Sequence, residues 1–125
     1  MSARYFYDSY AVLAFTSGRP SYRKYFEEGD GVLTKLNLLE VFYRSLERYD
    51  LKAASDISES FSKYLVDFEL DDIAGSMKMR LELKHKGLDV SYADALGYFL
   101  SRKMGIRFLT GDRTFRSLSG VEYVE

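Results

Sequence analysis

The pattern of apolar and polar residues opens with an aromatic run, residues 4–7, that has the composition of a short β-strand. The run lacks the apolar–polar alternation of a half-exposed strand, so we expect it to be buried on both faces. Asp8 and Ser9 interrupt it, and either residue suits the N-cap of a helix that continues to about Ser17. Open α/β sheets bind their ligands beyond the carboxyl ends of the strands, which is where this pattern puts Asp8.

The remaining pattern predicts short strands that alternate with helices. The expected helices cover residues 21–28, 36–49, 51–64, 73–86 and 91–104, and the expected strands cover 32–34, 106–110 and 121–124. Residues 65–70 alternate between apolar and acidic side chains, which indicates a further edge strand. In the helix over 36–49, one broad apolar face bordered by Glu40 contains Leu38, Leu39, Phe42, Tyr43, Leu46 and Tyr49.

This order of elements predicts the fold class. Short strands separated by helices imply a parallel sheet with helices on both faces, because parallel neighbours need a crossover between them. We therefore expect an α/β fold, a three-layer α/β/α sandwich around a central parallel sheet. The 125 residues suffice for one core and contain no internal repeat or linker, so residues 1–125 are expected to form a single domain.

The composition narrows the classes of function. A formal net charge of −1 provides no overall basic field, so any contact with nucleic acid has to use a local patch. The absence of cysteine excludes disulfides, thiolate chemistry and zinc–sulfur sites. The first ten residues lack the long apolar core of a signal peptide, and no apolar run is long enough to span a bilayer. We therefore expect a soluble cytoplasmic protein with no membrane partner.

Two of the four candidate site carboxylates follow predicted strands. Asp8 comes directly after the strand over 4–7, and Asp112 follows the strand over 106–110 after one glycine. The alternative role of Asp8 is a helix N-cap, and that of Asp112 is an ordinary Gly-Asp turn residue. Because parallel strands end at the same edge of a sheet, both carboxylates are expected there, where the Thr110 hydroxyl could orient a ligand or water.

The other two candidate carboxylates belong to predicted helices. Glu40 lies at the margin of an apolar helix face, where it could instead pair with Arg44 four residues later. Asp94 matches a capping box with Ser91, which is its alternative role. Asp94 also shares its helix face with small residues that would let a ligand or another backbone come close, namely Gly97 and Ser101. The pattern alone leaves both roles open for each residue.

Together the four carboxylates predict a metal site. A parallel sheet brings two strand ends, a helix start and a helix that follows the second strand to one end of the domain. Carboxylates gathered in a partly dry pocket repel one another, and some must take up protons unless a cation joins them. Oxygen ligands without His or Cys favour Mg²⁺ or Mn²⁺ over zinc.

The same residues, taken in order, resemble the PIN-domain family, the nuclease fold of VapC-type toxins in toxin–antitoxin pairs. The resemblance rests on four stretches that span nearly the whole chain, namely residues 7–9, 37–41 preceded by Thr34, 91–95 and 109–115. No single stretch is specific to this family, and the resemblance depends on all four occurring in this order. Tyr10 departs from the family pattern, in which small residues are frequent at this position.

The resemblance implies a sheet of strand order 3-2-1-4-5 and a Mg²⁺- or Mn²⁺-dependent endoribonuclease that hydrolyses phosphodiester bonds of RNA. It also implies a homodimer and a VapB-type antitoxin that wraps the toxin and blocks its cleft. Carried over to this sequence, the acidic quartet is Asp8, Glu40, Asp94 and Asp112, supported by Ser9 and Thr110.

The resemblance also implies roles for these residues. Asp8 and Asp112 would bind the metal directly, Asp94 would bind it directly or through water, and Glu40 would be a ligand or the base for the attacking water. Arg113 and Arg116 are candidates to bind the substrate phosphate, with solvated loop charges as the alternative. The alternative function is a binding module of the same fold, for RNA or protein, with a weak or absent metal site.

Overall fold

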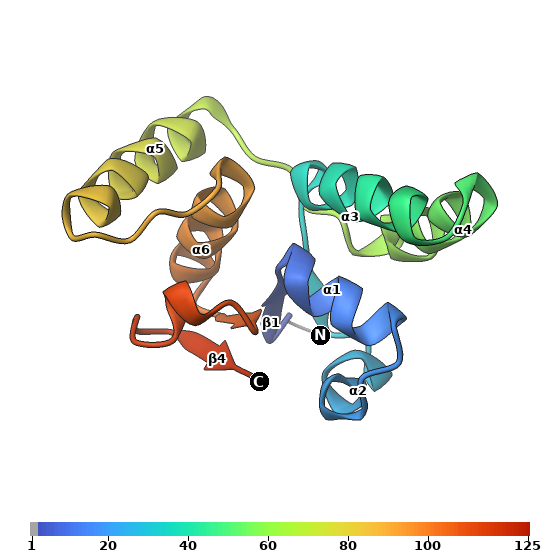
Figure 1. Ribbon diagram of the computed structural model, residues 1–125. Coiled ribbons are helices and arrows are strands. Elements are labelled where there is room, and N and C mark those ends of the chain that lie inside the picture. The colour runs from blue at the N-terminus through green and yellow to red at the C-terminus, as the bar shows by residue number, and fades with distance from the viewer. Residues whose placement is uncertain (1–2) are drawn as a thin grey trace.

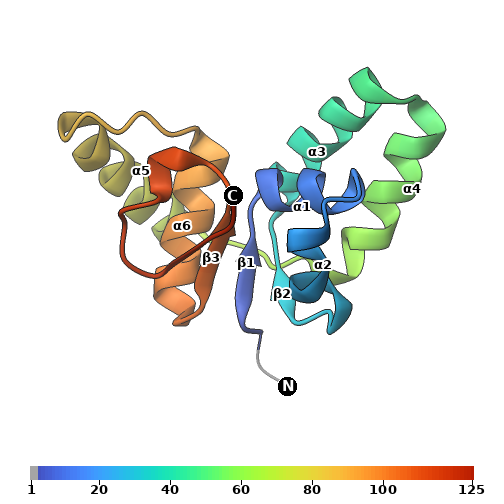
Figure 2. The same ribbon diagram turned by 60° about the horizontal axis from the view of Figure 1, so that its bottom comes forward.

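The structure, a computed structural model, describes residues 3–125, and its sheet has four parallel strands. The strands are β1 (Tyr5–Tyr7), β2 (Gly31–Val32), β3 (Arg107–Thr110) and β4 (Val121–Tyr123). Their order in the sheet is β2-β1-β3-β4, and Figure 2 shows β1 between β2 and β3. The first strand of the chain, β1, therefore lies in the interior of the sheet, beside β3, from which it is separated by about 100 residues of sequence.

Helices cover both faces of the sheet, which confirms the α/β class. The helices are α1 (Ser9–Thr16), α2 (Pro20–Glu27), α3 (Lys35–Arg48), α4 (Leu51–Phe61), α5 (Leu70–His85) and α6 (Tyr92–Met104). Helices α1 to α4 lie on one side of the sheet and α5 and α6 on the other (Figures 1 and 2). Within residues 3–125, no helix combines the length and the apolar character needed to cross a bilayer.

The central strand β1 separates two hydrophobic cores. The Tyr7 side chain points to the α1–α4 side, where its ring stacks on Phe26 with centroids 4.1 Å apart. Phe6 points to the opposite side and stacks on Phe108 beneath α6, with centroids 5.8 Å apart. Both β1 side chains are fully buried, so the expectation of a strand buried on both faces is confirmed.

The expected edge strand over residues 65–70 is wrong. Only Leu65 forms a parallel bridge, to Leu33, at the sheet position that the order 3-2-1-4-5 gives to its third strand. Of the acidic residues that alternate here, Glu69 instead caps α5, and its backbone N–H donates to the Asp72 carboxylate at 2.8 Å. The alternation therefore marks a short bridge followed by a helix cap.

Helix α3 also differs from its predicted orientation. The face that it buries carries Asn37, Val41 and Ser45, so small and polar residues make the close contacts of this helix. Four residues of the predicted apolar face are instead exposed on the surface, namely Leu39, Tyr43, Leu46 and Tyr49. Leu51, at the start of α4, continues this exposed apolar surface along the chain.

Candidate active site

Two candidate carboxylates lie at the same edge of the sheet because β1 and β3 are parallel neighbours. Tyr7 of β1 pairs with Leu109 of β3, and the backbone N–H of Asp8 donates to the Leu109 carbonyl at 3.3 Å. Asp8 follows the end of β1, and Asp112 follows the end of β3 after one glycine. The sheet register thus brings together two residues that are about as far apart in the sequence as this chain allows.

Both of these carboxylates also cap helical segments, which was predicted as the alternative role of Asp8, whereas the alternative role predicted for Asp112 was that of a turn residue. Asp8 accepts a hydrogen bond from the Ala11 backbone N–H at 2.7 Å and begins α1. Asp112 accepts from the Thr114 backbone N–H at 3.0 Å and begins a short 3₁₀ turn, Arg113–Phe115. Capping fixes the orientation of each side chain, so this role is compatible with one in a site at the sheet edge.

Glu40 is positioned by a buried polar network at the start of α3. The Asn37 side-chain oxygen accepts from the Thr34 backbone N–H at 2.9 Å and from the Thr34 hydroxyl at 3.0 Å. The Asn37 amide in turn donates to the Ser9 hydroxyl at 3.3 Å, which ties α3 to the first turn of α1. All three partners are nearly or fully buried. The network therefore fixes the position of α3, and with it Glu40, relative to the edge of the sheet.

Asp94 is positioned by the close approach of α6 to the sheet. A Cβ atom on Gly97 would lie 2.5 Å from Cε1 of Phe6 and 3.1 Å from Cε1 of Phe108, so only glycine fits without a shift. The small residues that share a helix face with Asp94 therefore let α6 pack on β1 and β3. One turn before Gly97, the Asp94 backbone N–H donates to the Ser91 hydroxyl at 3.0 Å, as the capping box predicts.

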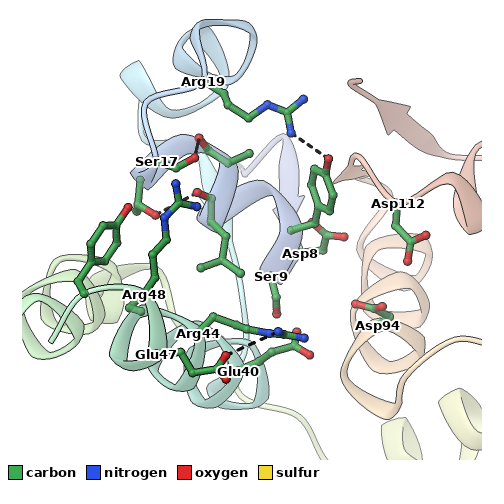
Figure 3. A pocket seen from close by; sticks show the side chains of 16 residues that line it. Asp8, Ser9, Ser17, Arg19, Glu40, Arg44, Glu47, Arg48, Asp94 and Asp112 are labelled. Carbon is green, nitrogen blue, oxygen red and sulfur yellow. Dashed lines mark hydrogen bonds and ion pairs between the residues drawn. The ribbon is translucent and has the colours of Figure 1, made fainter. Parts of the chain in front are cut away.

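All four carboxylates line one cavity of about 700 Å³. Figure 3 shows Asp8, Glu40, Asp94 and Asp112 facing a common space from the sheet edge, α3 and α6. The Glu40–Arg44 ion pair, the alternative role of Glu40, is not formed, and Arg44 instead pairs with Glu47 at 3.7 Å. Among residues 3–125, no basic side chain lies within ion-pair distance of any of the four carboxylates.

The cavity raises the pKa of two of these groups. Burial raises the pKa of Asp8 well above its usual value, and the Asp94 and Asp112 carboxylates raise it further against the opposing hydrogen bonds from Thr110 and Ala11. Burial, followed by the charge of Glu40, raises the pKa of Asp94 to about 6. Both shifts have the cause that the sequence predicts, namely acids gathered away from water without a compensating cation.

The donor set of the cavity fits a hard divalent cation. It consists of carboxylate oxygens without a basic partner, the ligands preferred by Mg²⁺ and Mn²⁺. In the part of the chain that the structure describes, however, no three acidic or histidine side chains surround one point closely enough to hold an ion. The acids share a cavity without forming a closed ligand set, so a cation would have to draw them together.

The supporting residues have different surroundings. Ser9 lines the cavity and is held by Asn37, and the buried Thr110 hydroxyl accepts from the Asp112 backbone N–H at 3.0 Å. Arg113 and Arg116 are exposed and do not line the cavity, so their phosphate-binding role stays a prediction.

Sequence reasoning missed several residues of the cavity wall. They include three arginines, Arg19, Arg44 and Arg48, whereas Tyr10, which the sequence singled out as a departure from the family pattern, lines the cavity as well. The spacing of Glu40, Arg44 and Arg48 by four residues was the available clue, since such residues share one helix face. Asn37 was quoted within a motif, but its role in holding α3 to α1 was not foreseen.

Comparison with known proteins connects this geometry to a fold. No protein-family model matches the sequence, and no curated protein matches it. Among solved structures, a chain of the DNA-bound VapBC from Salmonella typhimurium aligns over 98% of this chain and 97% of its own, with TM-score 0.75 and 17% identity. VapBC2 from Rickettsia felis, bound to a DNA fragment from their promoter, aligns over 96% of both chains with TM-score 0.72 and 17% identity.

A toxin–antitoxin complex from Klebsiella pneumoniae gives a third match, over 97% of this chain and 96% of the other, with TM-score 0.71 and 18% identity. These matches cover nearly the whole of each chain, so the likeness concerns the complete fold. The chain has the fold of VapC-type PIN domains, which confirms the α/β fold with a central parallel sheet that the sequence resemblance implied.

Proposed function

We propose that this protein is a Mg²⁺- or Mn²⁺-dependent endoribonuclease and the toxin of a toxin–antitoxin pair. The observation that carries the proposal is the gathering of four carboxylates, from separate parts of the sequence, in one cavity where none has a basic partner. A divalent cation bound there would supply a water of lowered pKa and neutralise charge on a phosphate oxygen. The proposal is supported by the fold that the chain shares with proteins of VapBC complexes.

The proposed roles follow from how each side chain is held. Asp8 and Asp112, fixed by their capping hydrogen bonds at the sheet edge, would hold the cation directly. Asp94, on the opposite side of the cavity from α3, would hold it directly or through water. Glu40, exposed to the cavity from α3, would be a further ligand or would accept the proton of the attacking water.

The proposed partners are an RNA substrate, a VapB-type antitoxin and a second copy of this chain. Three of the matching structures come from toxin–antitoxin or VapBC complexes, which supports an antitoxin partner. The large apolar side chains of Leu39, Tyr43, Leu46, Tyr49 and Leu51, all exposed on α3 and at the start of α4, support a protein partner of some kind. Coexpression with the product of a neighbouring gene, followed by measurement of complex mass, tests this proposal.

The central test is RNA cleavage by the wild-type chain and by Asp8→Asn. Asn is as good an N-cap as Asp, so the variant keeps the start of α1 while it loses a charged ligand. Cleavage should require Mg²⁺ or Mn²⁺, stop in EDTA, and fall in Asp8→Asn by at least about 100-fold, the lower end of what a positioned acid–base group contributes. Asp71→Asn, an exposed acid at the start of α5, is the matched control. Equal cleavage by wild type and Asp8→Asn would exclude the proposed reaction.

The alternative is a binding module for RNA or protein with a weak or absent metal site. The observation that favours it is that no three acids yet surround one point closely enough for an ion, within residues 3–125. Thermal unfolding separates the two functions, since a cation at 100 times its Kd stabilises the folded state by about 2.7 kcal/mol. If Mn²⁺ causes no shift and no RNA is cleaved, the binding module is the better description.

A further inference from the structure

The wall of the cavity carries both signs of charge. The four carboxylates that line it are here called the acidic end, and the part of the wall formed by Arg19, Arg44 and Arg48 is called the arginine end. Figure 3 shows Arg48 and Asp94 on opposite sides of the cavity. With Glu47 included, five carboxylates and three guanidinium groups line the cavity, a formal excess of two negative charges that one divalent cation would neutralise. A site for a cation alone would not need the arginine end.

One wall of the arginine end is a single face of α3. Glu40, Arg44 and Arg48 follow one another at intervals of four residues, and all three line the cavity. At a helix rise of 1.5 Å per residue, Arg44 and Arg48 lie about 6 and 12 Å along the axis from Glu40. A stacked nucleic-acid strand advances about 3.4 Å per nucleotide, so this wall follows roughly three nucleotides.

The opposite wall presents Arg19 in a fixed position between α1 and α2. Its guanidinium donates to the Tyr10 hydroxyl at 2.8 Å and lies over the rings of Tyr10 and Tyr22, at 5.6 and 5.3 Å from their centroids. Tyr22 is itself fully buried and donates its hydroxyl to the Val124 carbonyl at 2.6 Å. Within residues 3–125, neither Arg19 nor Arg48 has a carboxylate within ion-pair distance. Their charges are therefore available to a ligand.

We infer that the arginine end binds the phosphate backbone of a single RNA strand, on one side of the bond to be cut. This inference rests on the proposed nuclease function and adds to it the path of the substrate. Cations in a cavity wall that also carries aromatic rings, here those of Tyr10 and Tyr49, are the combination that binds single strands without sequence preference. Asp8 is only 1% exposed, so a strand has to enter the cavity for its phosphate to come near this carboxylate.

The test measures binding of a short fluorescein-labelled oligouridine, with Ca²⁺ in place of Mg²⁺ and RNA integrity checked afterwards. Arg19→Gln and Arg48→Gln should each raise Kd and reduce the slope of log Kd against log salt concentration by about 0.7, the value for one phosphate contact on a single strand. Arg23→Gln, an exposed arginine of α2 outside the cavity, is the matched control and should change neither quantity. Thermal unfolding of each variant verifies that the fold is intact.

A second measurement tests the direction of the strand. Oligouridines shortened from one end should lose affinity for the wild-type chain, while those shortened equally from the other end should not. In Arg48→Gln the loss from the sensitive end should be smaller, because the removed phosphate no longer has its partner. Equal losses from both ends, or losses unchanged by Arg48→Gln, would overturn the inference.

The two proposals fail in different ways. If the wild type cleaves RNA but Arg19→Gln and Arg48→Gln bind and cleave like Arg23→Gln, the substrate path is wrong and the nuclease function stands. If neither metal nor Asp8→Asn alters RNA cleavage, the nuclease function itself is wrong. Absence of oligouridine binding in the wild type would also overturn the inference, whatever occupies the arginine end instead.

Discussion

The two ends of the cavity are built in different ways. Asp8 and Asp112 at the acidic end are carried by strand ends, and backbone N–H groups fix their orientation. Arg44 and Arg48 at the arginine end are long side chains on a helix surface, and the Arg44 side chain is 61% exposed. The acidic end thus depends on the packing of the whole fold, whereas the arginine end depends on local surface contacts. Changes to the acidic framework should affect stability strongly, and changes to the arginine end should affect ligand binding instead.

The largest loss of stability is expected from Gly97→Val, which should disrupt the packing that positions the acidic end. The new side chain would collide with Phe6 and lift α6, and with it Asp94, away from the sheet. Overpacking of this kind should lower the free energy of unfolding by about 3 kcal/mol. Urea denaturation measures the loss, and Ala74→Val, at an exposed position of α5, controls for the lower helix propensity of valine. Similar losses in both variants would mean that α6 does not need to approach the sheet closely.

The next effect is the pH dependence that Asp94 gives to stability in the absence of divalent ions. Its pKa is about 6 in the folded chain and 3.8 as an ordinary carboxyl group, so between these values only the folded state keeps the proton. Stability should therefore fall as the pH rises from about 4 to about 6, by roughly 2 kcal/mol, less than the full shift would give because water screens a partly exposed group.

Asp94→Asn isolates this effect, since the other acids remain in place. Chemical denaturation in EDTA should give similar free energies of unfolding for wild type and Asp94→Asn at low pH. As the pH approaches 6, the free energy of unfolding of the wild type should fall relative to that of Asp94→Asn. Adding Mn²⁺ above that pH should restore the wild type preferentially. A difference between the two proteins that stays constant with pH would contradict the crowding of charge at the acidic end.

A smaller loss is expected when the framework behind Glu40 is damaged. Asn37→Ala removes the acceptor of the buried Thr34 N–H and the donor to Ser9. An unsatisfied buried donor should lower the free energy of unfolding by about 1.5 kcal/mol. Urea denaturation measures it, with Ser60→Ala, whose hydroxyl is exposed, expected to change stability by less than about 0.5 kcal/mol. If both variants unfold alike, Asn37 does not hold α3 in position.

The smallest effect on stability should come from the arginine end. Tyr10→Phe removes the hydroxyl that accepts from Arg19 but keeps the ring beneath the guanidinium. We expect stability within about 0.5 kcal/mol of wild type, and an oligouridine Kd about threefold higher because Arg19 is less firmly held. Tyr43→Phe, on the exposed surface of α3, serves as the control. An unchanged Kd would mean that the Tyr10–Arg19 contact does not prepare this end for a ligand.

The acidic end was accessible to sequence reasoning because its residues are tied to element boundaries. Asp8 and Asp112 follow strands whose aromatic or β-branched composition is readable, and parallel pairing then brings both to one edge. The fold class and the sheet with helices on both faces followed from the same alternation of elements. Binding of a cation by these residues stays a prediction.

The arginine end and two local features were not accessible, because they depend on tertiary contacts. Arginines at helical spacing read as solvated charges until the packing of α3 against α1 is known. The same packing turned Asn37 and Ser45 inward and left Leu39 exposed, although hydrophobicity alone predicts the reverse. Residues 65–70 failed because the Glu69–Asp72 cap uses the same acidic alternation as an edge strand.

The pairing of β1 with β3 has a consequence for the order of events during protein synthesis. Tyr5 is made long before its partner Arg107. Asp94 and Asp112 likewise emerge long after Asp8 and Glu40. Since contacts between distant residues form only after the intervening chain is available, a nascent chain has no complete acidic cavity until Asp112 has emerged. The proposed nuclease activity would therefore be absent from shorter nascent chains.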